Sequence, residues 1–263
     1  LTSFKQSEES LNNQSKIRSN TQFNNLRNGK KTPELKYEIA KMLFMDDSSS
    51  EEELRTAKKL VLSAANSGFF KAQNMVATFL ESGSYFEKNI NEAINWFKKA
   101  VKNGCNDSKV SLGLMYEYGN EYLTADLNRA FELYKDAANS NHAYGQYNLA
   151  TLYQYGDGDI EKDIDKAIKL YTKSADNNDA NAQNALGTMY YSGDGFTENH
   201  KKAFELFHKA ASNGLSFAQS NVAEMYRDGE GVKKNKQKAI KYFRLAANQG
   251  YKPAKECLIK LSS

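Results

Sequence analysis

The chain has 263 residues and carries 36 Lys or Arg against 32 Asp or Glu, which leaves a formal net charge of only +4 at pH 7. This balance disfavours a dedicated nucleic-acid-binding protein, because such proteins carry a strong basic excess. An apolar content of 40% is enough for a sizeable core, while no apolar run approaches the roughly 18 residues of a membrane-spanning helix. We therefore expect neither nucleic acid nor an integral membrane contact among the partners.

The first 32 residues differ in composition from the rest of the chain. They are rich in Ser, Asn and Gln and contain six basic and two acidic residues, so the whole basic excess lies here. We expect residues 1–32 to form a mostly disordered, polar and basic tail. Thr32 and Pro33 then predict a helix start, with Thr32 as the N-cap and Pro33 at the first helical position, where its missing N–H is not needed.

Residues 33–263 are dominated by an internal repeat of 36 or 37 residues. Copies of one element begin at Ala57 (AKKLVLSAANSG), Ala93 (AINWFKKAVKNG), Ala130 (AFELYKDAANSN), Ala167 (AIKLYTKSADNN), Ala203 (AFELFHKAASNG) and Ala239 (AIKYFRLAANQG). A second element precedes each copy, for example LATLY from Leu149 and LGTMY from Leu186. Two elements that recur in phase predict six repeats, at about 34–68, 69–104, 105–141, 142–178, 179–214 and 215–250, and a cap over 251–263.

Both elements of the repeat have the apolar period of a helix. In Ala203–Asn213, apolar side chains recur at i, i+3, i+4, i+7 and i+8. Glycine-rich loops such as Gly193–Gly195 separate the two helices of a repeat. Small residues at the position of Gly187 predict close helix approaches, and aromatic residues at the position of Phe207 are expected to fill the core. Because one hairpin cannot bury its own apolar stripe, the hairpins must stack on one another.

The motif LGTMYYSGDG from Leu186, followed by KAFELFHKAA from Lys202, resembles the Sel-one-like repeat (SLR) family, a relative of tetratricopeptide solenoids. The resemblance covers residues 34–263 and is closest over 143–250. It implies an all-α fold, a right-handed α/α superhelical solenoid of about six helical hairpins plus a C-terminal capping helix. It also implies an adaptor, because family members serve in endoplasmic-reticulum protein degradation, fungal cell-wall control, bacterial envelope assembly and host interaction. The first repeat departs from the pattern, since Met45–Ser50 replaces the glycine-rich loop.

Candidate catalytic and metal-binding groups are few. Cys105 and His142 occupy equivalent places in successive repeats, where helix packing would separate them by about 8–10 Å, well beyond the ~3 Å that a nucleophile and its base need. The chain also lacks the Ser-x-x-Lys signature of β-lactam-acting enzymes. The acidic run from Asp157 to Asp165 lacks the glycine and final glutamate of a calcium-binding loop. We expect no enzymatic activity, no cofactor and no metal.

The cysteines bear on the compartment. Cys105 and Cys257 are too few for a disulfide framework and are expected to be free thiols, with Cys257 buried. This favours a cytoplasmic location, while the first residue, Leu1, leaves open a signal peptide that has been removed.

The first helix of each repeat is expected to line the concave side of the solenoid. If Ala150 and its equivalents are buried, the residue that follows each of them and the residue three positions before it should face that groove. For Ala223 the latter residue is Ser220. The predicted partner-binding residues are Tyr144, Tyr147, Gln154, Asn184, Tyr191, Phe217, Glu224 and Arg227. Exposed tyrosine and arginine side chains are typical anchors of protein interfaces.

The sequence thus predicts a monomeric, non-enzymatic scaffold that binds another protein or peptide segment in this groove. One alternative is a secreted or envelope-associated protein, including a host-interacting one, that binds through its convex face or its basic tail. A more remote alternative is a hydrolase.

Overall fold

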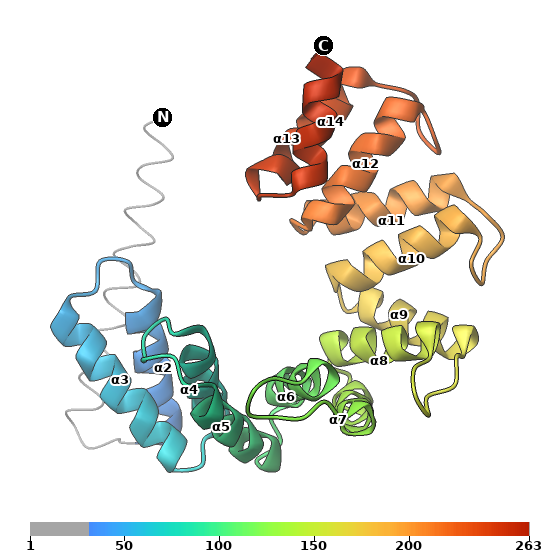
Figure 1. The fold of residues 1–263 in the computed structure, drawn as a ribbon. Coiled ribbons are helices and arrows are strands. Elements are labelled where there is room, and N and C mark those ends of the chain that lie inside the picture. Colours follow the sequence, from blue (N-terminus) through green and yellow to red (C-terminus); the bar gives the residue numbers. More distant parts are fainter. Residues whose placement is uncertain (1–31, 263) are drawn as a thin grey trace. The chain divides into compact units, whose positions relative to one another are not determined.

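The computed structural model describes residues 32–262, and this part of the chain is built from thirteen α-helices. In chain order they are α2 (Pro33–Met45), α3 (Glu51–Asn66), α4 (Phe70–Ser82), α5 (Ile90–Lys102), α6 (Asn106–Tyr118), α7 (Leu127–Asn139), α8 (Ala143–Tyr155), α9 (Ile164–Asp176), α10 (Ala180–Ser192), α11 (His200–Ser212), α12 (Ser216–Asp228), α13 (Lys236–Asn248) and α14 (Lys252–Ser262) (Figure 1). Pairing of extended segments in the described residues is limited to two isolated bridges in loops. The predicted all-α fold is confirmed.

The helices pack as consecutive hairpins. Helix α2 packs on α3, α4 on α5, α8 on α9, α10 on α11 and α12 on α13, and successive hairpins also touch, as α9 touches α10. The chain divides into two compact units, one that runs to Met115 and includes Gly119–Thr124, and one that comprises Tyr116–Tyr118 and the residues from Ala125 onward. No helix in the described part of the chain has the length and apolarity to cross a bilayer. The predicted tail, residues 1–31, lies outside the described residues, and the predicted repeat limits remain predictions.

Aromatic side chains join successive hairpins in the first unit. Thr32 accepts a hydrogen bond from the backbone of Leu35 at 3.3 Å, and Pro33 opens α2, so this predicted helix start is confirmed. The ring of Phe44 in α2 lies 4.9 Å from that of Phe79 in α4, edge to face. The Tyr85 hydroxyl, beyond α4, donates a hydrogen bond of 2.7 Å to the Phe44 carbonyl oxygen. The first unit therefore couples neighbouring hairpins through both rings and backbone.

The second unit has the predicted core of small and aromatic residues. Ala150, Gly187 and Ala223 occupy equivalent positions of α8, α10 and α12 and are buried. At Gly187, a Cβ atom would lie only 2.7 Å from two carbons of the Phe207 ring in α11. The ring of Phe207 thus approaches the α10 backbone so closely at Gly187 that only glycine leaves room for it. The expectation that these positions mediate close helix approaches is confirmed.

Buried glutamines also connect successive hairpins, a feature that the apolar pattern did not predict. In α10, the Gln183 side chain donates to the Ala175 carbonyl oxygen of the preceding hairpin at 3.3 Å. The same side chain accepts a hydrogen bond of 3.2 Å from Asn213, which closes the second helix of its own hairpin. Gln219 repeats this arrangement in α12, where it donates to Ala211 and accepts from the closing residue of α13. In these two hairpins, a buried amide whose hydrogen bonds are satisfied therefore links the hairpin to the preceding one.

Two details of the sequence-based expectations concern the cysteines. Cys105 and Cys257 are both free thiols. Cys105 is buried, but Cys257 is only partly buried, so the expectation of a buried Cys257 was wrong. The reason is that Cys257 lies in the terminal helix α14, which has α13 on one side only, whereas Ala254 of the same helix is fully buried against the core.

We predict that Gly187→Ala destabilises the protein by about 1–2 kcal/mol. Overpacking a core costs about 1–3 kcal/mol, and the better helix propensity of alanine returns up to about 1 kcal/mol of this. Urea unfolding followed by circular dichroism measures the effect. Thr188→Ala, at the adjacent exposed position, should change stability by less than about 0.5 kcal/mol.

The cause can be checked with a second substitution. Because Gly187→Ala clashes with a ring, Phe207→Leu should cost less in the Gly187→Ala background than in the wild-type protein. Equal costs in the two backgrounds would show that the ring is not what requires glycine at this position.

Candidate partner-binding surface

The predicted binding residues all lie on the first helices of three successive hairpins in the second unit. We call this set the first-helix surface: Tyr144, Tyr147 and Gln154 on α8, Asn184 and Tyr191 on α10, and Phe217, Glu224 and Arg227 on α12. Three of its rings are substantially exposed, with relative accessibilities of 38% for Tyr144, 38% for Tyr191 and 50% for Phe217. Whether this surface binds a partner stays a prediction.

On α8, the tyrosines form a fixed stack. The rings of Tyr144 and Tyr147 are nearly parallel, with centroids 5.8 Å apart and an interplanar angle of 6°. Tyr147 packs in turn against Tyr171 of α9, whose ring is buried and whose hydroxyl donates to Gln154 at 2.8 Å. Gln154 thus has a structural role in the hairpin, and its partner-binding role stays a prediction. The exposed ring of Tyr144 is therefore connected to the core by way of Tyr147 and the buried Tyr171.

The charge near this stack is negative. Asp179 caps α10 by accepting a hydrogen bond of 2.8 Å from the backbone of Ala182. Burial raises the pKa of the Tyr144 and Tyr147 phenols, and the Asp179 charge raises both further. Both tyrosines consequently remain neutral hydrogen-bond donors across the physiological pH range.

Helices α10 and α12 are linked directly by polar side chains. Asn221 of α12 donates a hydrogen bond of 3.0 Å to the Asn184 side chain of α10. The Tyr191 hydroxyl donates to Glu230, in the loop after α12, at 2.5 Å. The Tyr191 ring also stacks on His200, with centroids 4.7 Å apart. The hydrogen bond to the Glu230 carboxylate, with burial, raises the pKa of Tyr191 to about 12.

On α12, a cation and several carboxylates lie close together. Arg227 donates two hydrogen bonds to Asp228, of 2.9 and 2.6 Å. Glu224 is half-buried, and burial raises the pKa of its carboxyl group while Arg227 opposes the shift. The negative charges of Asp228 and Glu230 also raise the pKa of Glu224, because like charges disfavour its ionised form. This end of the first-helix surface is therefore acidic in spite of Arg227.

One expectation for this surface was wrong. The spacing rule placed Ser220 in the groove, but Ser220 is only 2% exposed. It occupies the position that Tyr147 has in α8 and Asn184 in α10. A serine side chain is too short to reach past its neighbours, and it bonds to Glu224 instead.

Sequence reasoning missed Glu230, His200 and Asn221, each of which fixes a residue of the first-helix surface. Glu230 left a signal, because Gly229-Glu230-Gly231 stands where the two preceding repeats have Gly-Asp-Gly. The glutamate is one methylene longer than aspartate. Its carboxylate extends from the loop after α12 to Tyr191 at the end of α10.

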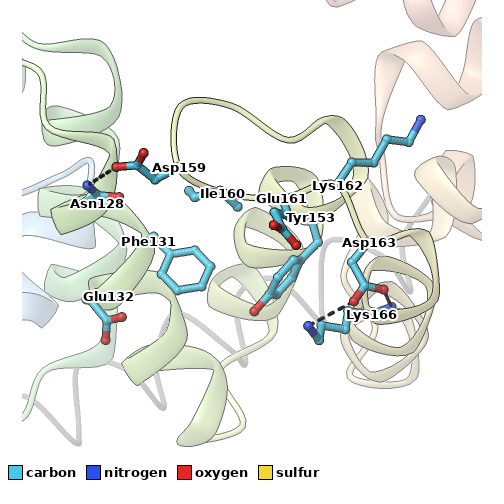
Figure 2. A pocket seen from close by; sticks show the side chains of 10 residues that line it. All are labelled: Asn128, Phe131, Glu132, Tyr153, Asp159, Ile160, Glu161, Lys162, Asp163 and Lys166. Carbon is cyan, nitrogen blue, oxygen red and sulfur yellow. Dashed lines mark hydrogen bonds and ion pairs between the residues drawn. The ribbon is translucent and has the colours of Figure 1, made fainter.

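A separate pocket of about 370 Å³ lies near the loop that joins α8 and α9 (Figure 2). Phe131 and Tyr153 line it, with ring centroids 5.7 Å apart and edge to face. Lys166 lies over the Tyr153 ring at 5.0 Å and pairs with Asp163 at 3.0 Å. The acidic run from Asp157 to Asp165, which lacks the glycine and final glutamate of a calcium-binding loop, supplies part of the pocket lining. Its Asp163 serves as the N-cap of α9. The predicted binding residues lie elsewhere.

The histidines and acidic side chains have structural contacts. His142 accepts a hydrogen bond from the Gly145 backbone at the start of α8, and His208 lies 3.0 Å from the Tyr242 hydroxyl. In the part of the chain that the structure describes, His, Cys, Asp and Glu side chains form no group of three that could hold a metal ion.

The chain was compared with known families and structures. The Sel1 repeat model matches residues 70–105, 107–142, 143–179, 180–215 and 216–251. Curated protein sequences gave no significant match. The first hairpin, α2 and α3, precedes the first matched segment, in agreement with the departure of this repeat from the motif.

Solved structures of the same repeat class are similar to the chain. An SLR-fold protective antigen of uropathogenic Escherichia coli is 25% identical over 91% of this chain, with a TM-score of 0.71; the match spans only 50% of the antigen. A Sel1 repeat protein from Oxalobacter formigenes is 25% identical over 79% of this chain and 82% of its own, with a TM-score of 0.68. A further Sel1 repeat protein, from Klebsiella pneumoniae, is 26% identical over 77% and 98%, with a TM-score of 0.51.

We predict that Glu230→Gln lowers the pKa of Tyr191 from about 12 toward its ordinary value of 10.0. Glutamine still accepts the hydrogen bond, but it lacks the charge that opposes phenolate formation. NMR titration of tyrosine labelled with ¹³C at Cζ measures the shift. Glu205→Gln, on the exposed face of α11, should leave the titration of Tyr191 unchanged.

The raised pKa of Tyr191 determines how stability changes with pH in the alkaline range. Because the pKa of Tyr191 is higher in the folded than in the unfolded chain, its contribution is complete below pH 10 and is lost as the pH rises toward 12. Glu230→Gln should therefore reduce the loss of stability over this interval. A wild-type Tyr191 that titrates near pH 10 would contradict the assigned hydrogen bond.

Proposed function

Because the chain belongs to the Sel1 repeat family, we propose that it is a non-enzymatic scaffold that binds a segment of another polypeptide on the first-helix surface. Repeats of this family generally mediate protein interactions. Solenoid repeats suit this role, since each hairpin adds one helix face to an extended surface.

The observation that carries the proposal is the contrast between constant and varied positions in successive repeats. Buried positions keep their chemistry in α8, α10 and α12, as the glutamines Gln146, Gln183 and Gln219 do. Surface positions change: Tyr144 corresponds to Asn181 and Phe217, and Gln154 corresponds to Tyr191 and Arg227. At a third position, α8 and α10 share threonine, and α12 has Glu224. Packing alone would be satisfied by the same residues in every repeat. A surface on which each repeat presents a different group is suited to one particular partner.

The exposed rings are also prepared for binding. Tyr144 is stacked on Tyr147, Tyr191 on His200, and Phe217 packs edge to face on Tyr251 at 5.3 Å. A large ring that is already held in one orientation loses little conformational entropy when a partner covers it. Such rings are the usual energetic centres of protein interfaces.

The proposal of a non-enzymatic role rests on the histidines. His142 caps α8, His200 stacks on Tyr191 and pairs with Glu198, and His208 contacts Tyr242. Each ring therefore has a structural role with a partner of its own: His142 lies at the start of α8, and His200 and His208 lie about two turns apart on α11. A general base must lie within about 3 Å of the group that it activates.

The second candidate is a host-interacting or envelope-associated protein that binds through its second helices or its tail. One observation favours it: a structure that is 25% identical to the chain is described as a protective antigen of uropathogenic E. coli. In this model, exposed lysines of the second helices, such as Lys173 and Lys209, would make the contacts.

We predict that a triple variant, Tyr144→Ala, Tyr191→Ala and Phe217→Ala, weakens partner binding at least about 30-fold, because each ring is expected to act as an interface anchor. The partner is first identified by affinity purification from the native host and then purified. Isothermal titration calorimetry compares its affinity for the wild-type chain and for the variant.

A matched variant tests the other face. It carries Lys173→Ala, Lys209→Ala and Leu245→Ala, three exposed residues of α9, α11 and α13. The scaffold model expects this variant to bind within about threefold of the wild type. Loss of affinity in this variant alone would replace the first-helix surface by the second helices. Thermal unfolding by circular dichroism confirms that both variants are folded.

A further inference from the structure

We propose that the segment bound on the first-helix surface is basic, with a lysine or arginine side chain inserted among Tyr191, Glu224 and Glu230. This inference rests on the proposed function and specifies the chemistry of the partner. It is carried by the distribution of charge between the two helix types, by the arrangement of side chains around Tyr191, and by the contacts that cations make elsewhere in the chain.

Charge is divided between the two helices of each hairpin in the second unit. Helices α8, α10 and α12 contain no lysine, and Arg227 is their one basic residue. Helices α9, α11 and α13 carry ten, namely Arg244 and nine lysines: Lys166, Lys169, Lys173, Lys201, Lys202, Lys209, Lys236, Lys238 and Lys241. A basic segment would therefore be repelled by the second helices and accepted by the first.

Around Tyr191, the acidic groups outweigh the basic ones. Glu224, Asp228 and Glu230 all act electrostatically on Tyr191. Arg227 donates two hydrogen bonds to Asp228, and the charge of Lys234 also acts on Asp228. Glu230 accepts its hydrogen bond from the neutral phenol of Tyr191 through Oε2. Glu224 also interacts with Arg227 and Ser220. Three carboxylates nevertheless face one arginine and one lysine here, so a further cation gains charge pairing at Glu224 and Glu230.

The rings of the first-helix surface are arranged differently from those of the hairpin ends. At the hairpin ends, the chain places its own cation over a ring: Arg129 over Tyr116 at 5.4 Å, Lys166 over Tyr153 at 5.0 Å and Lys238 over Tyr226 at 5.0 Å. Among the described residues, the rings of Tyr144, Tyr191 and Phe217 instead have aromatic neighbours and no such cation. An exposed ring face beside carboxylates is a binding site for an ammonium or guanidinium group.

The acidic character continues toward α8. Glu117 and Asp179 both act electrostatically on Tyr144, at the other end of the first-helix surface. The intervening part of α10 presents Asn184 and Thr188, which are neutral and can form hydrogen bonds. A segment that runs from α8 to α12 would therefore meet negative charge at both ends and a polar, uncharged stretch between them.

The experiment uses two labelled peptides of twelve residues, (Lys-Ala-Arg-Ser)₃ and (Glu-Ala-Asp-Ser)₃, and measures their binding to the full chain by fluorescence anisotropy. The basic peptide should bind and the acidic peptide should not. The net charge of the chain is +4, so non-specific attraction would favour the acidic peptide, which is the opposite result. Failure of the basic peptide to bind, or equal binding of the two, would overturn the inference.

Charge-removing variants locate the site. The double variant Glu224→Gln and Glu230→Gln should weaken binding of the basic peptide at least tenfold, since it removes two charges and keeps the acceptor for Tyr191. The matched control, Glu132→Gln and Glu205→Gln, removes two exposed charges from α7 and α11 and should change binding less than twofold. Equal effects of the two variants would overturn the assignment to this cluster.

Binding of the purified partner to the two variants distinguishes a failure of the proposed scaffold function from a failure of the proposed basic segment. If the triple ring variant abolishes partner binding while Glu224→Gln and Glu230→Gln leave it intact, the scaffold function stands and the basic segment is wrong. If the ring variant also leaves partner binding intact, the scaffold function on this surface is wrong as well.

Discussion

The second unit depends on how closely one helix can approach the next. Where α11 meets α10, the Phe207 ring lies against a backbone that has no Cβ atom at Gly187. Such contacts bury apolar surface that a single hairpin would leave exposed to water, which is the condition for a repeat protein to fold. The buried amide of Gln183 adds direction to this apolar contact, because its hydrogen bonds to Ala175, Asn178 and Asn213 depend on the register of the neighbouring hairpins.

This packing scheme determines which side chains can vary. Residues on the stacked sides of each helix are constrained by volume or by hydrogen bonding, whereas positions that face solvent are not. In α8, α10 and α12 the solvent-facing positions hold tyrosine, asparagine, glutamine, glutamate and arginine in an order that differs from one helix to the next. Even there the side chains are not independent, since Tyr144 is held through Tyr147 and Tyr191 is held by Glu230 of the following repeat.

The features that were predictable from the sequence are those that depend on short-range periodicity. The helices, their hairpin order and the buried small and aromatic positions all follow from a period of 36 or 37 residues and from apolar spacing within it. Two predictions of burial were wrong for different reasons. Ser220 is buried because its side chain is short, and Cys257 is partly exposed because it lies in the last helix of the chain. Glu230 was missed because its role depends on a residue 39 positions away, which the spacing within one helix does not record.

The division of charge between helix types has a physical consequence for specificity. Lysines on α9, α11 and α13 keep the outward face of the second helices hydrated and repel cationic surfaces, while the nearly uncharged first helices carry their few carboxylates beside exposed rings. On the proposed binding mode, a partner would be selected by attraction at the first helices and by repulsion at the second helices, and repulsion is what excludes wrong partners. Since Arg227 is paired with Asp228, an acidic segment would have to compete with an existing bidentate ion pair, whereas a basic segment finds carboxylates beside a ring that is already fixed in place.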